Sequence, residues 1–83
     1  MNNNYYYTTD LALATALIAT SISKLSHLEE IDSQRSTFVF ERTPQLDSII
    51  ELFWQKNLPV DCQTYFEALR YVKSRLYEER SGR

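Results

Sequence analysis

The segment from Leu11 to Ser23 contains no charged side chain, although 24% of the residues in this 83-residue chain are charged. On a helical wheel its large apolar side chains share one face: Leu13, Leu17, Ile18, Ile22 and Leu25. The other face carries only small side chains: Ala12, Thr15, Ala16, Ala19, Thr20 and Ser23. A surface helix normally carries Lys and Glu on its outer face. The segment therefore predicts a central helix that is covered on both sides.

The length of the chain predicts a single domain, with little room for a large core. The formal charge of −2 argues against a general nucleic-acid coat, but residues 70–83 carry five basic and two acidic side chains. Cys62 is the only cysteine, which excludes an internal disulfide and favours a reducing, cytoplasmic location. The charge-free segment is too short to span a bilayer. It also follows Asp10 rather than a basic residue, which argues against a signal peptide.

The first half of the chain predicts one helix and a two-stranded antiparallel hairpin. Residues 1–7 are rich in Asn and Tyr, and we expect a disordered N-terminal segment. Thr8 or Thr9 can cap the first helix. The segment 36–41 has the β-branched and aromatic composition of a strand, with Phe38 and Phe40 on one face. Residues 27–32 are the nearest partner strand, joined to it by a turn over residues 32–35.

The second half predicts two more helices. Thr43 and Pro44 form a helix start, and the helix should run to about residue 56. Pro59 interrupts the pattern, and Asp61 can cap a third helix that runs to about residue 78. The predicted core positions of that helix are Cys62, Tyr65, Phe66, Leu69, Val72 and Leu76. The prediction is a small α+β domain over residues 8–79 in the order α-β-β-α-α, followed by a tail over residues 80–83.

Three segments of this chain resemble a domain-of-unknown-function family of short bacterial and phage proteins. They are the sequences at residues 10–14 (DLALA), at residues 37–41 (TFVFE), and at residues 68–69 with 72–76 (AL and VKSRL). The resemblance extends over most of residues 10–76. The family has no assigned activity, so the resemblance implies no catalytic residue, cofactor or partner.

The composition offers little material for a catalytic, metal or cofactor site. His27 and Cys62 are the only residues of their types, so one chain cannot assemble a Cys/His metal site. The only glycine, Gly82, lies next to the terminus, where no glycine-rich phosphate loop can form. Cys62 falls on the apolar face of its helix, and we expect a buried structural thiol. We therefore predict a non-enzymatic protein with no cofactor and no evident small-molecule substrate.

A basic stripe is predicted on the third helix. Its members follow the spacing i, i+3, i+7, i+10: Arg70, Lys73, Tyr77 and Arg80. Basic side chains that alternate with an aromatic residue could contact phosphates and stack on bases. Cations near a helix C-terminus are also favoured by the helix dipole, which gives an ordinary explanation for the same pattern. Binding of a nucleic acid or another polyanion is therefore the alternative function.

The leading prediction is a protein-interaction module that binds a partner protein or forms a homodimer. The small-residue face of the first helix would allow another chain to approach closely, and an exposed tyrosine is a good anchor at an interface. The candidate interface residues are Ala12, Ala16, Ala19 and Tyr71. No membrane association is predicted.

Overall fold

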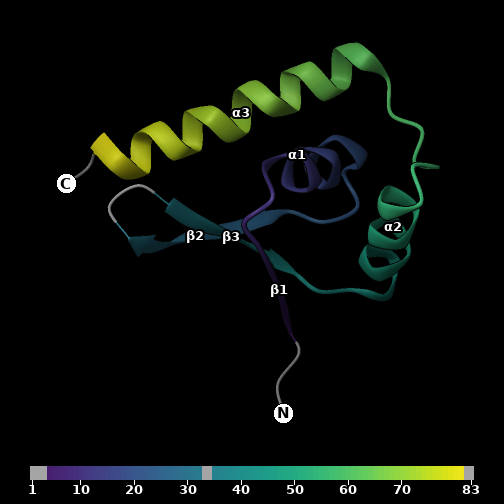
Figure 1. Ribbon diagram of the computed structural model, residues 1–83, viewed down its shortest axis with the longest axis horizontal. Helices are drawn as coiled ribbons and strands as arrows, with labels where there is room; N and C mark the ends of the chain where they lie inside the picture. Colours follow the sequence, from purple (N-terminus) through teal and green to yellow (C-terminus); the bar gives the residue numbers. More distant parts are fainter. Residues whose placement is uncertain (1–3, 33–34, 82–83) are drawn as a thin grey trace.

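The computed structural model describes residues 4–32 and 35–81, with the backbone alone for residues 80 and 81. These residues form three helices and a three-stranded antiparallel sheet. The elements are β1 (Tyr5–Thr8), α1 (Leu11–Thr20), β2 (Leu25–Asp32), β3 (Arg35–Glu41), α2 (Pro44–Trp54) and α3 (Cys62–Ser81). The predicted α+β class is confirmed. Figure 1 shows α1 between the sheet and α3, with α2 beside α1.

The sheet contains one strand more than the sequence predicted. β3 is the central strand, antiparallel to β2 on one side and to β1 on the other, where Tyr6 lies opposite Phe40. The predicted order α-β-β-α-α with a two-stranded hairpin is therefore wrong, and the order is β-α-β-β-α-α. Tyr5–Tyr7, which we expected to be disordered, belong to β1. Tyrosine and threonine favour strands, but the pairing partner of this segment lies far away in the sequence.

The predicted hairpin between β2 and β3 is present, with irregularities in β2. Register shifts occur between Leu25 and His27 and between Glu30 and Asp32. The predicted turn over residues 32–35 falls partly on residues 33 and 34, which lie outside the described part of the chain. Phe38 and Phe40 face the core, as predicted, and are 3% and 0% exposed.

Each helix begins with a side-chain cap. Thr43 caps α2 and Asp61 caps α3, as predicted, by accepting hydrogen bonds from backbone N–H groups three residues later. The cap of α1 is Asp10 rather than Thr8 or Thr9, because Asp10 Oδ1 accepts from the N–H of Leu13 at 3.0 Å. The Thr8 hydroxyl instead accepts a hydrogen bond from the N–H of Asp10, at 3.0 Å.

The middle of α1 is enclosed by the rest of the chain. Residues 13–17 are all buried. Thr15 is fully buried too, and its hydroxyl is satisfied by donating to the Leu11 carbonyl at 2.8 Å. The main core cluster contains Leu13, Ala14, Leu17, Leu28, Phe38, Phe40, Leu46 and Val72. The predicted cover on both sides is thus confirmed for this part of α1, and the chain itself supplies it.

α3 is longer than predicted and less buried. It runs through Ser81, so the backbone of residues 80 and 81, assigned to a tail, is helical. Val72 and Ala68 are its buried apolar residues, at 0% and 6% exposure. Two predicted core positions are wrong: Cys62 and Phe66 are both exposed. The first turns of α3 line a hollow beside α1, which is the candidate site.

Candidate functional site

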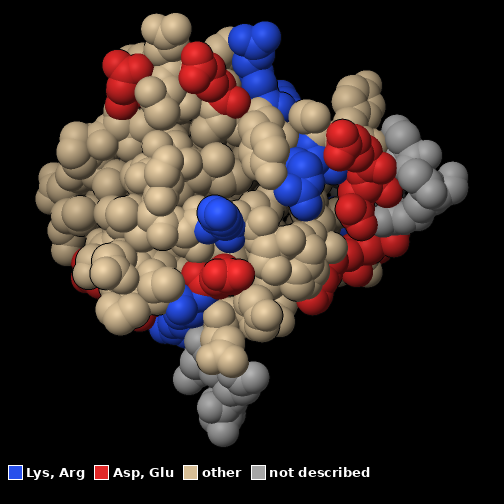
Figure 2. All heavy atoms as spheres, turned by 180° about the vertical axis from the view of Figure 1, so that it is seen from behind, with Lys and Arg blue, Asp and Glu red and all other residues tan. Residues whose placement is uncertain are grey.

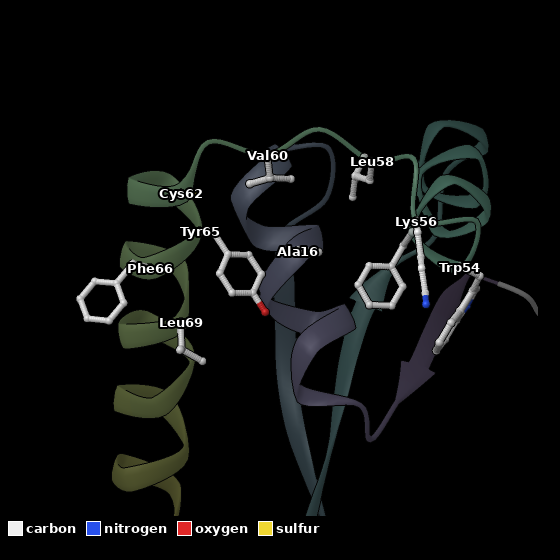
Figure 3. A pocket seen from close by; sticks show the side chains of 10 residues that line it. Ala16, Trp54, Lys56, Leu58, Val60, Cys62, Tyr65, Phe66 and Leu69 are labelled. Atoms are coloured by element: carbon white, nitrogen blue, oxygen red, sulfur yellow. The ribbon is translucent and has the colours of Figure 1, made fainter.

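An apolar groove of about 660 Å³ lies between α1, α3 and the segment that joins α2 to α3. We call it the α2–α3 groove. Its lining residues are Ala16, Phe53, Trp54, Lys56, Leu58, Val60, Cys62, Tyr65, Phe66 and Leu69. Figure 3 shows that they come from four parts of the chain: α1, the C-terminal end of α2, the linker over residues 55–61, and the first turns of α3.

The linker is shaped by the way in which α2 ends. The N–H of Lys56 donates to the Phe53 carbonyl at 3.0 Å, and the N–H of Asn57 donates to the Leu52 carbonyl at 2.9 Å. This is a Schellman pattern, and it places Lys56 in the left-handed region with φ 62°. Glycine is the usual residue there, because a side chain at positive φ costs about 1–2 kcal/mol. The linker then turns back with Leu58 and Val60 above the groove (Figure 3).

α3 and α1 form the opposite wall and the floor. Tyr65 and Leu69 are half-buried and project from α3 toward α1 (Figure 3). Ala16 of α1 lies at the floor and is only 3% exposed. Because alanine is small, the side chains above it do not close over the gap. The predicted small-residue face of α1 therefore contributes one residue to the groove.

Two large aromatic side chains flank the groove and remain exposed. Trp54 is 59% exposed and Phe66 is 55% exposed. Figure 3 shows them on opposite sides, with Trp54 beyond Lys56 and the Phe66 ring on the outer side of α3, pointing away from α1. Trp54 was not among the predicted site residues, and Phe66 was predicted to lie in the core. Both lie near an apolar stripe, and helical periodicity alone does not show where a neighbouring element ends.

The lining contains a single charged residue, Lys56. The acidic residue Glu51, near the C-terminal end of α2, lines a separate hollow on that helix. Asp61 is occupied by the cap of α3, where its carboxylate accepts from the backbone N–H and the hydroxyl of Thr64 at 3.0 and 3.2 Å. These hydrogen bonds, chiefly the one from the Thr64 backbone, lower the pKa of Asp61. Neither carboxylate therefore belongs to the groove.

Charges elsewhere on the surface are mixed in sign. Figure 2 shows Lys and Arg interspersed with Asp and Glu on the face opposite to that of Figure 1, and a broad area with few charges on the side of α2. Such a distribution produces no extended field of one sign on this face. The area with few charges is thus the more prominent feature of this side of the molecule.

The structure separates the four residues predicted to form a protein interface. Ala16 lies in the α2–α3 groove, whereas Tyr71, 44% exposed, lines a second hollow of about 420 Å³ beside Ile18 and Leu25. Ala12 is exposed and Ala19 is half-buried, and neither lines either hollow. The set does not form one continuous patch.

Three members of the predicted basic stripe, Arg70, Lys73 and Tyr77, are exposed on α3. Lys73 is exposed, and Tyr77 is 76% exposed. The Arg70 guanidinium lies over the ring of Phe66, 5.5 Å from its centroid, and so connects the stripe to the groove. The side chain of Arg80, the fourth predicted member, lies outside the described part of the chain.

His27 lies in a short hydrogen-bonded chain on β2. Its ring nitrogens are 2.9 Å from the Ser26 hydroxyl and 3.0 Å from a Glu29 carboxylate oxygen. All three side chains are exposed neighbours on an edge strand, and none of them lines the α2–α3 groove. Within residues 4–32 and 35–81, no group of three or more His, Cys, Asp or Glu side chains is arranged to hold a metal ion.

The fold and the groove together define a small α+β domain with an open apolar surface. The chain belongs to the family described as a domain of unknown function, DUF5659, whose family model matches residues 3–78. The resemblance inferred from the sequence is thereby confirmed at the level of the family. Neither a curated protein nor a solved structure matches the chain. In the described part of the chain, every helix is too short or too polar to cross a membrane.

Proposed function

We propose that this protein is a non-enzymatic protein-interaction domain and that a segment of a partner protein docks in the α2–α3 groove. One observation carries the proposal: Trp54 and Phe66 are both more than half exposed, and both belong to the lining of an apolar hollow of about 660 Å³. Contiguous apolar surface of this kind is uncommon on monomeric soluble proteins and marks interaction sites. Aromatic side chains in such positions commonly dominate binding energies.

The energy available at the groove is of the right size for a specific but moderate interaction. Covering the exposed half of one large aromatic side chain removes about 100 Å² from water, which is worth about 2–3 kcal/mol. Trp54 and Phe66 together thus supply about 5 kcal/mol. Association itself costs about 4–15 kcal/mol. A partner must therefore also contact the half-buried side chains between them, which favours a segment that runs along the whole groove.

Selection of short peptides from a random displayed library on the wild-type protein tests this proposal. We expect the selected peptides to lose at least about tenfold in affinity for Phe66→Ser, because an interface hot spot contributes about 2 kcal/mol or more. Tyr7→Ser is the matched control, since Tyr7 is 53% exposed but lies on the sheet. Affinity is measured by the fluorescence of Trp54, the only tryptophan of the chain.

The same variants also test whether a second copy of this chain occupies the groove. Sedimentation velocity would then show wild-type protein that self-associates and a Phe66→Ser variant that is monomeric. Peptides that bind wild type and Phe66→Ser equally, or a selection that recovers no peptide from a monomeric wild type, would contradict the proposed docking surface.

Polyanion binding by α3 is the second candidate function, and the position of Arg70 over the exposed Phe66 ring favours it. If Arg70 and Lys73 contact two phosphates, replacing both by Glu should abolish binding of mixed single-stranded oligonucleotides. Removing two such contacts should also reduce the slope of log K against log salt by about 1.4. Lys24→Glu is the control, because Lys24 is exposed and belongs to the segment between α1 and β2 rather than to α3. The absence of wild-type binding at about 50 mM salt, where phosphate contacts are strong, would exclude this candidate.

A further inference from the structure

We infer that the segment bound in the α2–α3 groove is an apolar peptide that carries a carboxylate and that this carboxylate pairs with the ammonium group of Lys56. The inference rests on the proposed docking function and specifies the chemistry of the partner. It follows from three features of the groove: its lining, the conformation of Lys56 and the separation of the two exposed aromatic residues.

Lys56 supplies the only charge in a lining otherwise made of aliphatic, aromatic and thiol side chains, with the phenol of Tyr65. No described carboxylate lies within ion-pair distance of it, whereas Arg35 and Arg42 pair with Asp32 and Asp47. Figure 3 shows its side chain extending beside Trp54. Because Lys56 is itself exposed, a carboxylate on the partner would form a partly exposed ion pair with it, and such a pair contributes to the choice and register of the partner more than to affinity.

The backbone holds Lys56 at this place. The hydrogen bond from its own N–H to the Phe53 carbonyl, and the one from the next residue, Asn57, to the Leu52 carbonyl, hold the backbone of Lys56, so its side chain starts from a defined point at the edge of the groove. A glycine in this conformation would place no side chain here, whereas Lys56 places an ammonium group at the edge of the groove. In the bound state this ammonium group fixes the register of the partner segment.

The distance between the exposed aromatic residues favours a peptide over a small amphiphile. Small-molecule sites typically bury 70–90% of their ligand in a concave pocket. In the α2–α3 groove, Trp54 and Phe66 lie exposed on opposite sides, and a compact ligand seated at Lys56 would leave Phe66 in water. A peptide segment spans both sides and reaches Lys56 between them.

Three peptide libraries test the inference. They share randomised apolar positions and differ at one fixed central residue, which is Glu, Gln or Lys. We expect the Glu library to yield the tightest binders to wild-type protein, with about a fivefold loss of affinity for Lys56→Gln, the upper end for a partly exposed ion pair. The charge reversal Lys56→Glu should invert the preference toward the Lys library. Lys24→Glu, outside the groove, should change neither preference.

Alkylation of Cys62 gives an independent measure of occupancy, since this thiol is exposed, lines the groove and is the only cysteine. Bound peptide should slow its reaction with iodoacetamide in wild type and less so in Lys56→Gln. Groove-dependent peptides without preference for Glu would overturn the inference and leave the proposed docking function intact. If every selected peptide bound wild type and Phe66→Ser equally well, both the inference and the proposed docking function would be overturned. If decanoate shifted the fluorescence of Trp54 in a way that depends on Lys56, and no peptide did so, the inferred peptide would be wrong and the ligand would be a small amphiphile.

Discussion

Truncation of Phe40 to alanine is expected to lower the free energy of unfolding by about 3–5 kcal/mol. Phe40 is fully buried on the central strand, and its ring belongs to the cluster that joins the sheet to α1, α2 and α3. Removing the ring leaves a cavity in the cluster formed by the sheet and the three helices. A domain of this length has a total stability of roughly 4–12 kcal/mol, so the substitution removes a large part of the whole.

The exposed residue Phe66 provides a matched control, because Phe66→Ala makes the same chemical change at a side chain that is 55% exposed. We expect that variant to lose less than about 1 kcal/mol. Chemical denaturation followed by circular dichroism measures both. If Phe40→Ala unfolds too completely for a transition to be fitted, Phe40→Leu should still show a loss of roughly 1–1.5 kcal/mol. Equal losses for Phe40→Ala and Phe66→Ala would show that the sheet does not form the core.

Removal of residues 1–7 is expected to cost about 3–5 kcal/mol, because it deletes most of β1. The deletion exposes one edge of the central strand, removes several ladder hydrogen bonds worth about 1 kcal/mol each, and removes the half-buried ring of Tyr6, worth about 1–2 kcal/mol. Tyr6 has a raised pKa, mainly because of desolvation, which is consistent with its packing against the core.

Substitutions of the exposed residues of β1 distinguish the stability contributed by strand pairing from that contributed by the exposed side chains. Tyr5→Ala and Tyr7→Ala change rings that are 43% and 53% exposed, and each should cost less than about 1 kcal/mol. The measurement is again the midpoint and slope of a denaturant melt. A deletion of residues 1–7 that leaves the melt unchanged would show that the hairpin of β2 and β3 is sufficient and that β1 adds nothing to stability.

Local patterns in the sequence determined most of the helices and the hairpin. Thr43 with Pro44 and Asp61 after Pro59 specify helix starts through side-chain caps and restricted backbone angles, and these signals act within a few residues. The alternation of Phe38 and Phe40 likewise places one face of β3 in the core. The charge-free segment predicted that α1 would be enclosed, because a helix on the surface normally carries charged side chains on its outer face.

Tertiary structure alone decided the third strand and the groove. β1 gains its hydrogen bonds from β3, and a strand whose partner is distant in the chain leaves no periodic signal of its own. Cys62 and Phe66 follow the apolar period of α3 but are exposed, because no neighbouring element of the described chain covers these two side chains. Periodicity reports which face of a helix is apolar. Only the packing of neighbouring elements decides whether that face is filled by the chain itself or left open, as it is in the α2–α3 groove.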